Sequence, residues 1–176
     1  MRHATCGMIA ALAAMLATPA QAERLLVDRT AYPPLARALE HQDDNVYFMR
    51  SEKPRFILDR IKVQGESLEN WREAVELVVY PRKPKVTAPL AWLDQFRAGE
   101  DKTCPSTWQV LESDATSVTF SRTAPRCAQL SGQTRIYRAV LGRKEVFTVA
   151  GLYRGEISDE MRRQWLALLA TARLES

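Results

Sequence analysis

Carboxylate side chains gather on both sides of one tryptophan in the middle of the chain. The acids are Glu66, Glu69, Glu73 and Glu76, and the tryptophan is Trp71. Glycoside hydrolases pair a protonated acid with an ionised carboxylate for acid and base catalysis. The sequence therefore permits a carboxylate-dependent hydrolase that acts on a glycan, with Glu69, Glu73 and Glu76 as its candidate acids.

Two observations favour a different interpretation of these acids. Basic residues lie close by in the sequence, and acids beside such residues usually form surface ion pairs that contribute little to stability. Residues 73–80 also alternate as a strand, so Glu73 and Glu76 are predicted to project from opposite faces of a sheet. Because opposite faces exclude a catalytic pair, we assign no catalytic residue from the sequence.

Histidine is scarce, and this limits the chemistry further. His3 lies at the N-terminus and His41 lies beside a polar loop, which is typical of a solvated side chain. The sequence contains no G-x-S-x-G, no G-x-G-x-x-G and no phosphate-binding loop. We therefore expect neither a metal site nor a cofactor.

Basic residues interleaved with tyrosines form a candidate interaction surface. Its members are Arg82, Lys83, Lys85, Arg135, Arg138, Tyr80 and Tyr137. Such a surface suits an anionic partner, either an envelope protein or an anionic lipid or polysaccharide. The alternative is a solvated sheet face whose cations prevent edge pairing. A net charge of +4 without a concentrated basic stripe does not indicate a nucleic-acid partner.

Residues 1–22 have the three parts of a secretory signal peptide. A positive start at Arg2 precedes an apolar run over residues 8–16, and Ala20-Gln21-Ala22 supplies small residues before the cleavage point. The apolar run is shorter than the roughly 20 residues of a spanning helix. We predict cleavage after Ala22 and one domain over residues 23–176, without a transmembrane segment, in the periplasm or secreted.

Two cysteines remain after the leader, Cys104 and Cys127. An even number of cysteines in an exported chain predicts a disulfide, and free thiols are the alternative. The loop-entropy estimate for this bridge is about 3.5 kcal/mol.

The pattern of apolar residues predicts the elements that position these groups. We expect strands over residues 46–50, 55–63, 73–80, 108–112, 116–122, 134–141 and 145–153. One helix is expected from a cap at Thr87 to Gly99, with Leu90, Leu93 and Phe96 on its apolar face, and a second follows Ser158. This order predicts an α+β fold, a mostly antiparallel twisted sheet of about six or seven strands with helices packed on one face.

A resemblance to a known fold adds to this interpretation. The segment Gly65-Glu66-Ser67-Leu68-Glu69-Asn70-Trp71 before a strand, and the order Cys127, Arg135-Ile136-Tyr137-Arg138, Gly142 and Trp165, are similar to small exported bacterial proteins of unknown function. The element order resembles the Mog1/PsbP-like α/β sandwich. The resemblance implies a noncatalytic accessory role.

Three functional hypotheses follow. The leading one is a noncatalytic exported accessory or interaction protein of the bacterial envelope. The second is the carboxylate-dependent hydrolase, acting on an envelope glycan. The third is a small-ligand carrier whose pocket is lined by one or more of the tryptophans Trp71, Trp92, Trp108 and Trp165.

Overall fold

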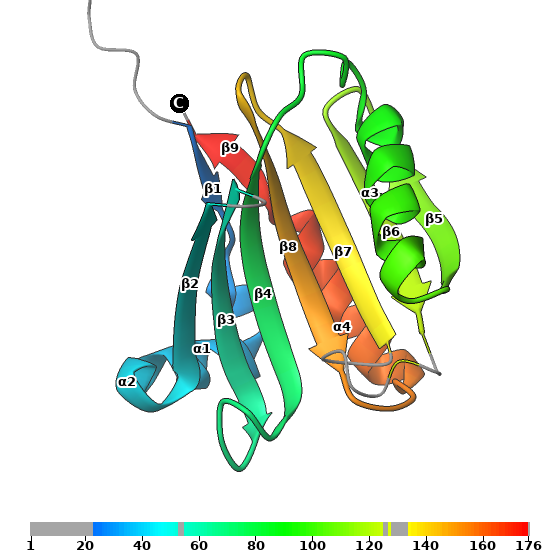
Figure 1. The fold of residues 1–176 in the computed structure, drawn as a ribbon. Coiled ribbons are helices and arrows are strands. Elements are labelled where there is room, and N and C mark those ends of the chain that lie inside the picture. The colour runs from blue at the N-terminus through cyan, green and yellow to red at the C-terminus, as the bar shows by residue number, and fades with distance from the viewer. Residues whose placement is uncertain (1–22, 53–54, 125–126, 128–133, 176) are drawn as a thin grey trace, which may run out of the picture.

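Seven antiparallel strands within the described residues form one sheet, in the spatial order β2-β3-β4-β8-β7-β6-β5 (Figure 1). The computed structural model describes residues 23–52, 55–124, 127 and 134–175. The strands are β2 (Val46–Glu52), β3 (Arg55–Gly65), β4 (Trp71–Pro81), β5 (Thr107–Ser113), β6 (Ser117–Thr123), β7 (Thr134–Leu141) and β8 (Glu145–Tyr153). A separate two-stranded sheet pairs β1 (Arg24–Leu26) with β9 (Arg173–Glu175).

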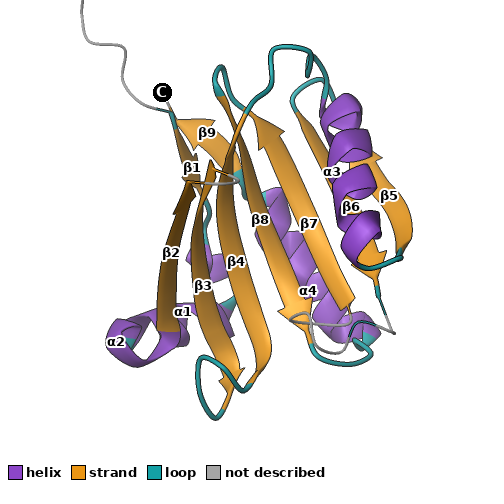
Figure 2. Cartoon of the chain, viewed as in Figure 1, coloured by secondary structure: helices purple, strands orange, loops and turns teal. Residues whose placement is uncertain are grey.

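The helices lie against the sheet, outside its layer of strands (Figure 2). A 3-10 helix (Arg29–Ala31) precedes α1 (Pro33–Glu40), α2 (Gln42–Asn45), α3 (Pro89–Thr103) and α4 (Asp159–Ala170). The predicted α+β class and antiparallel sheet are confirmed. No helix in the described ranges is long and apolar enough to cross a membrane. The predicted signal peptide lies outside those ranges.

The helices cover both faces of the sheet, and the prediction that they share one face is wrong. Helices α1 and α4 pack on one face, where Trp165 and Leu168 contact a core that includes Val75. Helix α3 packs on the other face, where Trp92 belongs to a second core that includes Ala74. The physical reason is that β4 and β8 carry apolar residues on both faces, so each face needs a cover.

Helix α3 differs from its prediction at both ends. Its N-cap is Ala88, with no capping side chain, and Pro89 begins the helix. The helix continues through Gly99 to Thr103, because an exposed glycine weakens a helix without ending it. Helix α4 begins as predicted, with the Ser158 hydroxyl accepting a hydrogen bond from the backbone N–H of Met161 at 3.2 Å.

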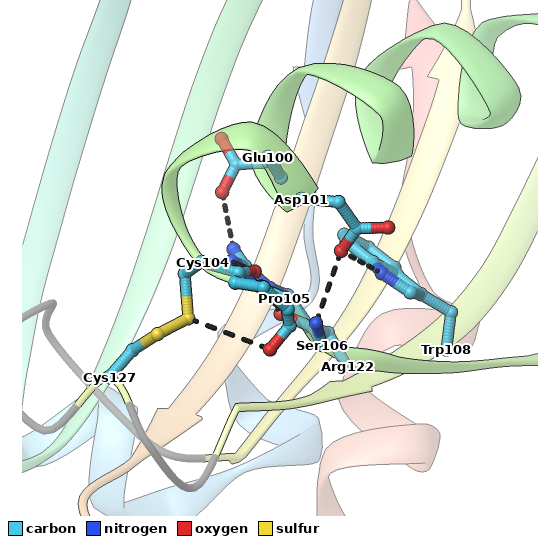
Figure 3. The surroundings of a disulfide bond; sticks show 8 residues. All are labelled: Glu100, Asp101, Cys104, Pro105, Ser106, Trp108, Arg122 and Cys127. Atoms are coloured by element: carbon cyan, nitrogen blue, oxygen red, sulfur yellow. Dashed lines mark hydrogen bonds and ion pairs between the residues drawn. A yellow bond between two sulfur atoms is a disulfide. The ribbon is translucent and has the colours of Figure 1, made fainter.

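The predicted disulfide is present and joins the end of α3 to the segment after β6 (Figure 3). Cys104 and Cys127 have their Cα atoms 6.1 Å apart. Beside the bridge, the Arg122 guanidinium donates to the Ser106 hydroxyl at 2.8 Å and lies over the Trp108 ring at 5.1 Å. Arg122 also forms an ion pair with Glu100 of α3, so this pair and the disulfide hold the C-terminal end of the helix against the strands.

Candidate functional site

Helix α3, the end of β4 and the loop between them border a small pocket, which we call the α3 pocket. It has a volume of about 200 Å³ and is lined by Arg55, Tyr80, Pro81, Lys83, Val86, Trp92, Gln95 and Phe96. Figure 1 shows α3 across one face of the sheet, over β6 and next to β7. The pocket therefore joins residues that are far apart in the chain.

The loop that carries Lys83 is fixed by its neighbour Arg82. The Arg82 side chain donates from Nε to the carbonyl of Val86 at 2.8 Å and from Nη1 to the carbonyl of Gly142 at 2.6 Å. The backbone N–H of Val86 also donates to the carbonyl of Lys83 at 2.9 Å. Arg82 was predicted to be part of the interaction surface, but its guanidinium positions the loop.

Aromatic rings form the wall of the α3 pocket. Trp92 and Phe96 stack with their centroids 4.9 Å apart, and the Tyr80 ring lies 6.1 Å from Trp92 and 6.0 Å from Phe96. Burial raises the pKa of Tyr80 above its usual range, so its hydroxyl stays neutral. This wall makes one side of the pocket apolar and aromatic.

Two exposed cations, Arg55 and Lys83, line the same pocket. Within the described part of the chain, neither side chain forms a hydrogen bond or an ion pair. Glu52 is the cross-strand neighbour of Arg55, but it pairs with Arg50 at 3.2 Å. The exposed Gln95 amide adds a neutral hydrogen-bonding group. The pocket thus presents positive charge beside an apolar wall, which favours an anionic partner.

Arg135 and Tyr137 lie beneath α3 and not on an open surface. Tyr137 is buried and stacks on Phe120 at 4.8 Å. Its hydroxyl accepts a hydrogen bond from Arg135 Nη1 at 3.0 Å, and Arg135 lies 3.9 Å from the Glu76 carboxylate. Burial raises the pKa of Tyr137. These two predicted interaction residues are part of a polar cluster in the core.

Arg138 projects from the opposite face of β7, because strand residues alternate. Its guanidinium donates to the Thr119 hydroxyl at 3.1 Å and lies 3.6 Å from Glu112 and 3.8 Å from Asp114. The seven residues of the predicted surface are therefore divided between two faces and the core. Tyr80 and Lys83 line the α3 pocket, and Lys85 is exposed on the same loop.

The three candidate acids of the hydrolase hypothesis lie apart. Glu73 is fully buried on the α4 face, where its carboxylate accepts a hydrogen bond from Trp165 Nε1 at 3.0 Å. Glu76 is buried on the α3 face and accepts from Arg60 Nε at 2.7 Å. Glu69 is exposed in the loop between β3 and β4. Glu73 and Glu76 thus do not form the pair that this hypothesis requires.

A second pocket of about 280 Å³ lies on the α4 face, next to β1. Its charged lining residues are Glu23, Arg24, Asp59 and Glu145. Burial raises the pKa of Asp59 above its usual range. Because acids outnumber cations there, this pocket does not suit the anionic partner that the basic residues predict.

One tryptophan of the carrier hypothesis, Trp92, lines the α3 pocket, whereas Trp71 and Trp165 are buried in the two cores. Sequence reasoning missed Arg55, Val86 and Gln95 as pocket residues, because no local pattern connects β3 to α3. Neither a protein-family model nor a curated protein sequence matches this chain.

Proposed function

We propose that the chain is a noncatalytic, exported accessory protein of the bacterial envelope that binds another envelope component at the α3 pocket. The observation that carries the proposal is an aromatic wall beside two exposed cations, Arg55 and Lys83, that have no ion-pair or hydrogen-bond partner among the described residues. Positive charge on a rim and aromatic groups within a pocket are common features of interaction sites.

The Cys104–Cys127 disulfide supports the exported location, because disulfides persist in oxidising compartments. The leader-like sequence of residues 1–22 supports it independently. The resemblance to small exported proteins with a Mog1/PsbP-like sandwich supports the accessory role. Periplasm and full secretion share the same leader, and the proposal covers both.

The hydrolase alternative loses its structural support. Its acids Glu73 and Glu76 lie on opposite faces, and both are engaged in buried contacts with side chains of the fold. The small-ligand carrier is supported by Trp92 in the α3 pocket. The volume of about 200 Å³ is below the roughly 300–1,000 Å³ of pockets that enclose drug-sized ligands. The pocket is therefore better suited to one group of a larger partner.

The test is a crosslinking pull-down from the native envelope, with the exported protein produced from the full chain. The decisive variant combines Arg55→Glu with Lys83→Glu and leaves Arg82 intact, since Arg82 holds the loop. The matched control combines Arg29→Glu with Lys102→Glu, which reverses the same number of exposed cations away from the pocket.

We expect one dominant partner that is lost with the pocket variant and retained with the control. A partner that the pocket variant retains would place the interface elsewhere on the molecule. Recovery of no specific partner would contradict the accessory role. In that case, a screen of glycan hydrolysis with the same preparation would examine the alternative.

A further inference from the structure

We infer that the α3 pocket receives a single aromatic side chain from an acidic segment of a partner protein. This inference rests on the proposed function and gives the chemistry of the partner. It combines three properties of the site: the small volume of the pocket, the stacked rings of its wall and the two cations that line it.

The volume limits the group that enters the pocket. About 200 Å³ accommodates a single side chain, and pockets for whole small ligands are generally larger. A lipid acyl chain would leave most of its length outside such a pocket. A polysaccharide needs a hydrogen-bond partner for each hydroxyl group that it buries, and few polar side chains line the pocket.

The wall selects an aromatic group among the side chains of that size. Trp92 and Phe96 are stacked on each other, and Tyr80 is tilted against both at interplanar angles of 48° and 60°. The aromatic ring of a partner can contact these rings edge to face. Such a contact adds binding free energy beyond that from burying apolar area. Aromatic residues that fill small pockets are typical centres of binding energy in protein interfaces.

The cations select acidic neighbours of that aromatic residue. Arg55 lies at the start of β3 and Lys83 on the loop after β4, so they flank the pocket from two elements. Lys85 extends the positive charge along the same loop. Because all three side chains are exposed, carboxylates of an extended segment can meet them without the cost of burying a charge.

The experiment is isothermal titration calorimetry of the exported protein with short capped peptides. The first peptide has phenylalanine flanked on both sides by glutamate, the second replaces phenylalanine with alanine, and the third replaces every glutamate with glutamine. The Arg55→Glu and Lys83→Glu double variant and the Arg29→Glu and Lys102→Glu control are titrated with the first peptide.

We expect binding of the first peptide, and a loss of roughly tenfold or more in affinity for each of the other two. The pocket variant is expected to lose roughly tenfold or more, whereas the control stays within about twofold. Raising the salt concentration should weaken the binding of the first peptide much more than the binding of the glutamine peptide, because salt screens exposed charges.

Two further probes distinguish the competing ligands. Phenylacetate that binds as tightly as the first peptide would overturn the inference in favour of a small aromatic acid. Phosphatidylglycerol vesicles are the second probe. If the parent binds these vesicles, the pocket variant does not, and no peptide binds, the inference is overturned in favour of a lipid surface. If no peptide binds while the pull-down partner still depends on Arg55 and Lys83, the aromatic-acidic chemistry is wrong and the proposed function stands.

Discussion

The Glu73 carboxylate links the two helical elements of the α4 face to the sheet. One oxygen accepts hydrogen bonds from the hydroxyl of Tyr32, which precedes α1, and from the indole of Trp165 in α4. Burial, together with the bond to Glu73, raises the pKa of Tyr32 above its usual range, so its hydroxyl remains a donor. A buried acid with two such donors has a structural role.

Replacing Glu73 by alanine is expected to lower the free energy of unfolding by about 3 kcal/mol, because two buried donors lose their acceptor. Glu73→Gln keeps an acceptor oxygen, and a loss of about 1 kcal/mol is expected. Urea denaturation measures both values, with the exposed Glu69→Gln as the control. Equal losses for alanine and glutamine would show that the two hydrogen bonds do not explain the stabilisation.

Asp114 fixes the turn between β5 and β6 and makes the stability of the protein depend on pH. Its carboxylate accepts from the Ser117 hydroxyl at 2.7 Å and from the backbone N–H of Thr116 at 2.6 Å. These bonds, first that from Ser117, hold the pKa of the Asp114 carboxyl well below its usual range. A carboxyl whose pKa is lowered by folding stabilises the protein at any pH above its pKa in the unfolded chain, which is about 4. This contribution is lost as the pH falls from about 4 towards the pKa in the folded protein.

We therefore expect Asp114→Asn to destabilise the protein at neutral pH and to reduce the loss of stability below about pH 4. The measurement is the urea midpoint of the parent and the variant at several pH values. Because Asp114 is half exposed, the effect is expected to be small. Parallel pH profiles of the two proteins would refute the assignment of this acid sensitivity to Asp114.

At the scale of elements, Gly151 determines how closely α4 approaches the sheet. A Cβ atom at Gly151 would lie 2.3 Å from Cδ2 of Trp165, so only glycine leaves room for this fully buried ring. Gly151→Ala is expected to destabilise the protein by about 2 kcal/mol through overpacking. Gly99→Ala is the control, because a Cβ there meets no atom within 4 Å and alanine favours the exposed helix α3.

Urea denaturation of the two alanine variants is expected to give shifts of opposite sign. A Gly151→Ala protein as stable as the parent would mean that α4 moves away from β8 without cost. The near-ultraviolet circular dichroism of the tryptophans then reports whether the Trp165 packing has changed.

The elements that follow from local patterns were predictable from the sequence. The bounds of β7 and β8 match the predicted ranges because alternation and the intervening turn are both local signals. Leu90 was expected on the apolar face of α3 and is 46% exposed, because tertiary packing sets the rotation of α3 about its own axis. The α3 pocket is lined by residues from β3 and from α3, and no local pattern in the sequence predicts that these two elements lie close together.

At the scale of the whole molecule, the two covered faces explain why basic residues do not form one surface. Arg135 and Arg138 are near neighbours in the chain, but one lies beneath α3 and the other on the opposite face. The α3 pocket keeps an excess of cations, whereas the pocket beside β1 has an excess of acids. The anionic partner that we propose would be oriented towards α3 by this asymmetry of charge.

The disulfide is expected to stabilise the whole fold without shaping the α3 pocket. Cys104 and Cys127 are separated by 23 positions that include the β5–β6 hairpin, and the bridge lies at the C-terminal end of α3. Of the pocket residues, Trp92 lies near the N-terminal end of that helix and Phe96 lies at its middle. Stability and binding are therefore separable properties of α3.

Replacing both cysteines by alanine is expected to lower the free energy of unfolding by about 3.5 kcal/mol, because the unfolded chain regains the freedom of an open loop. Urea denaturation of the parent, with and without a reductant, should reproduce this difference, whereas the double variant should not respond to the reductant. Peptide affinity at the α3 pocket should stay within about twofold of the parent, since the binding residues remain packed. A variant that keeps its stability but loses peptide binding would show that the bridge positions the pocket and has little effect on the unfolded chain.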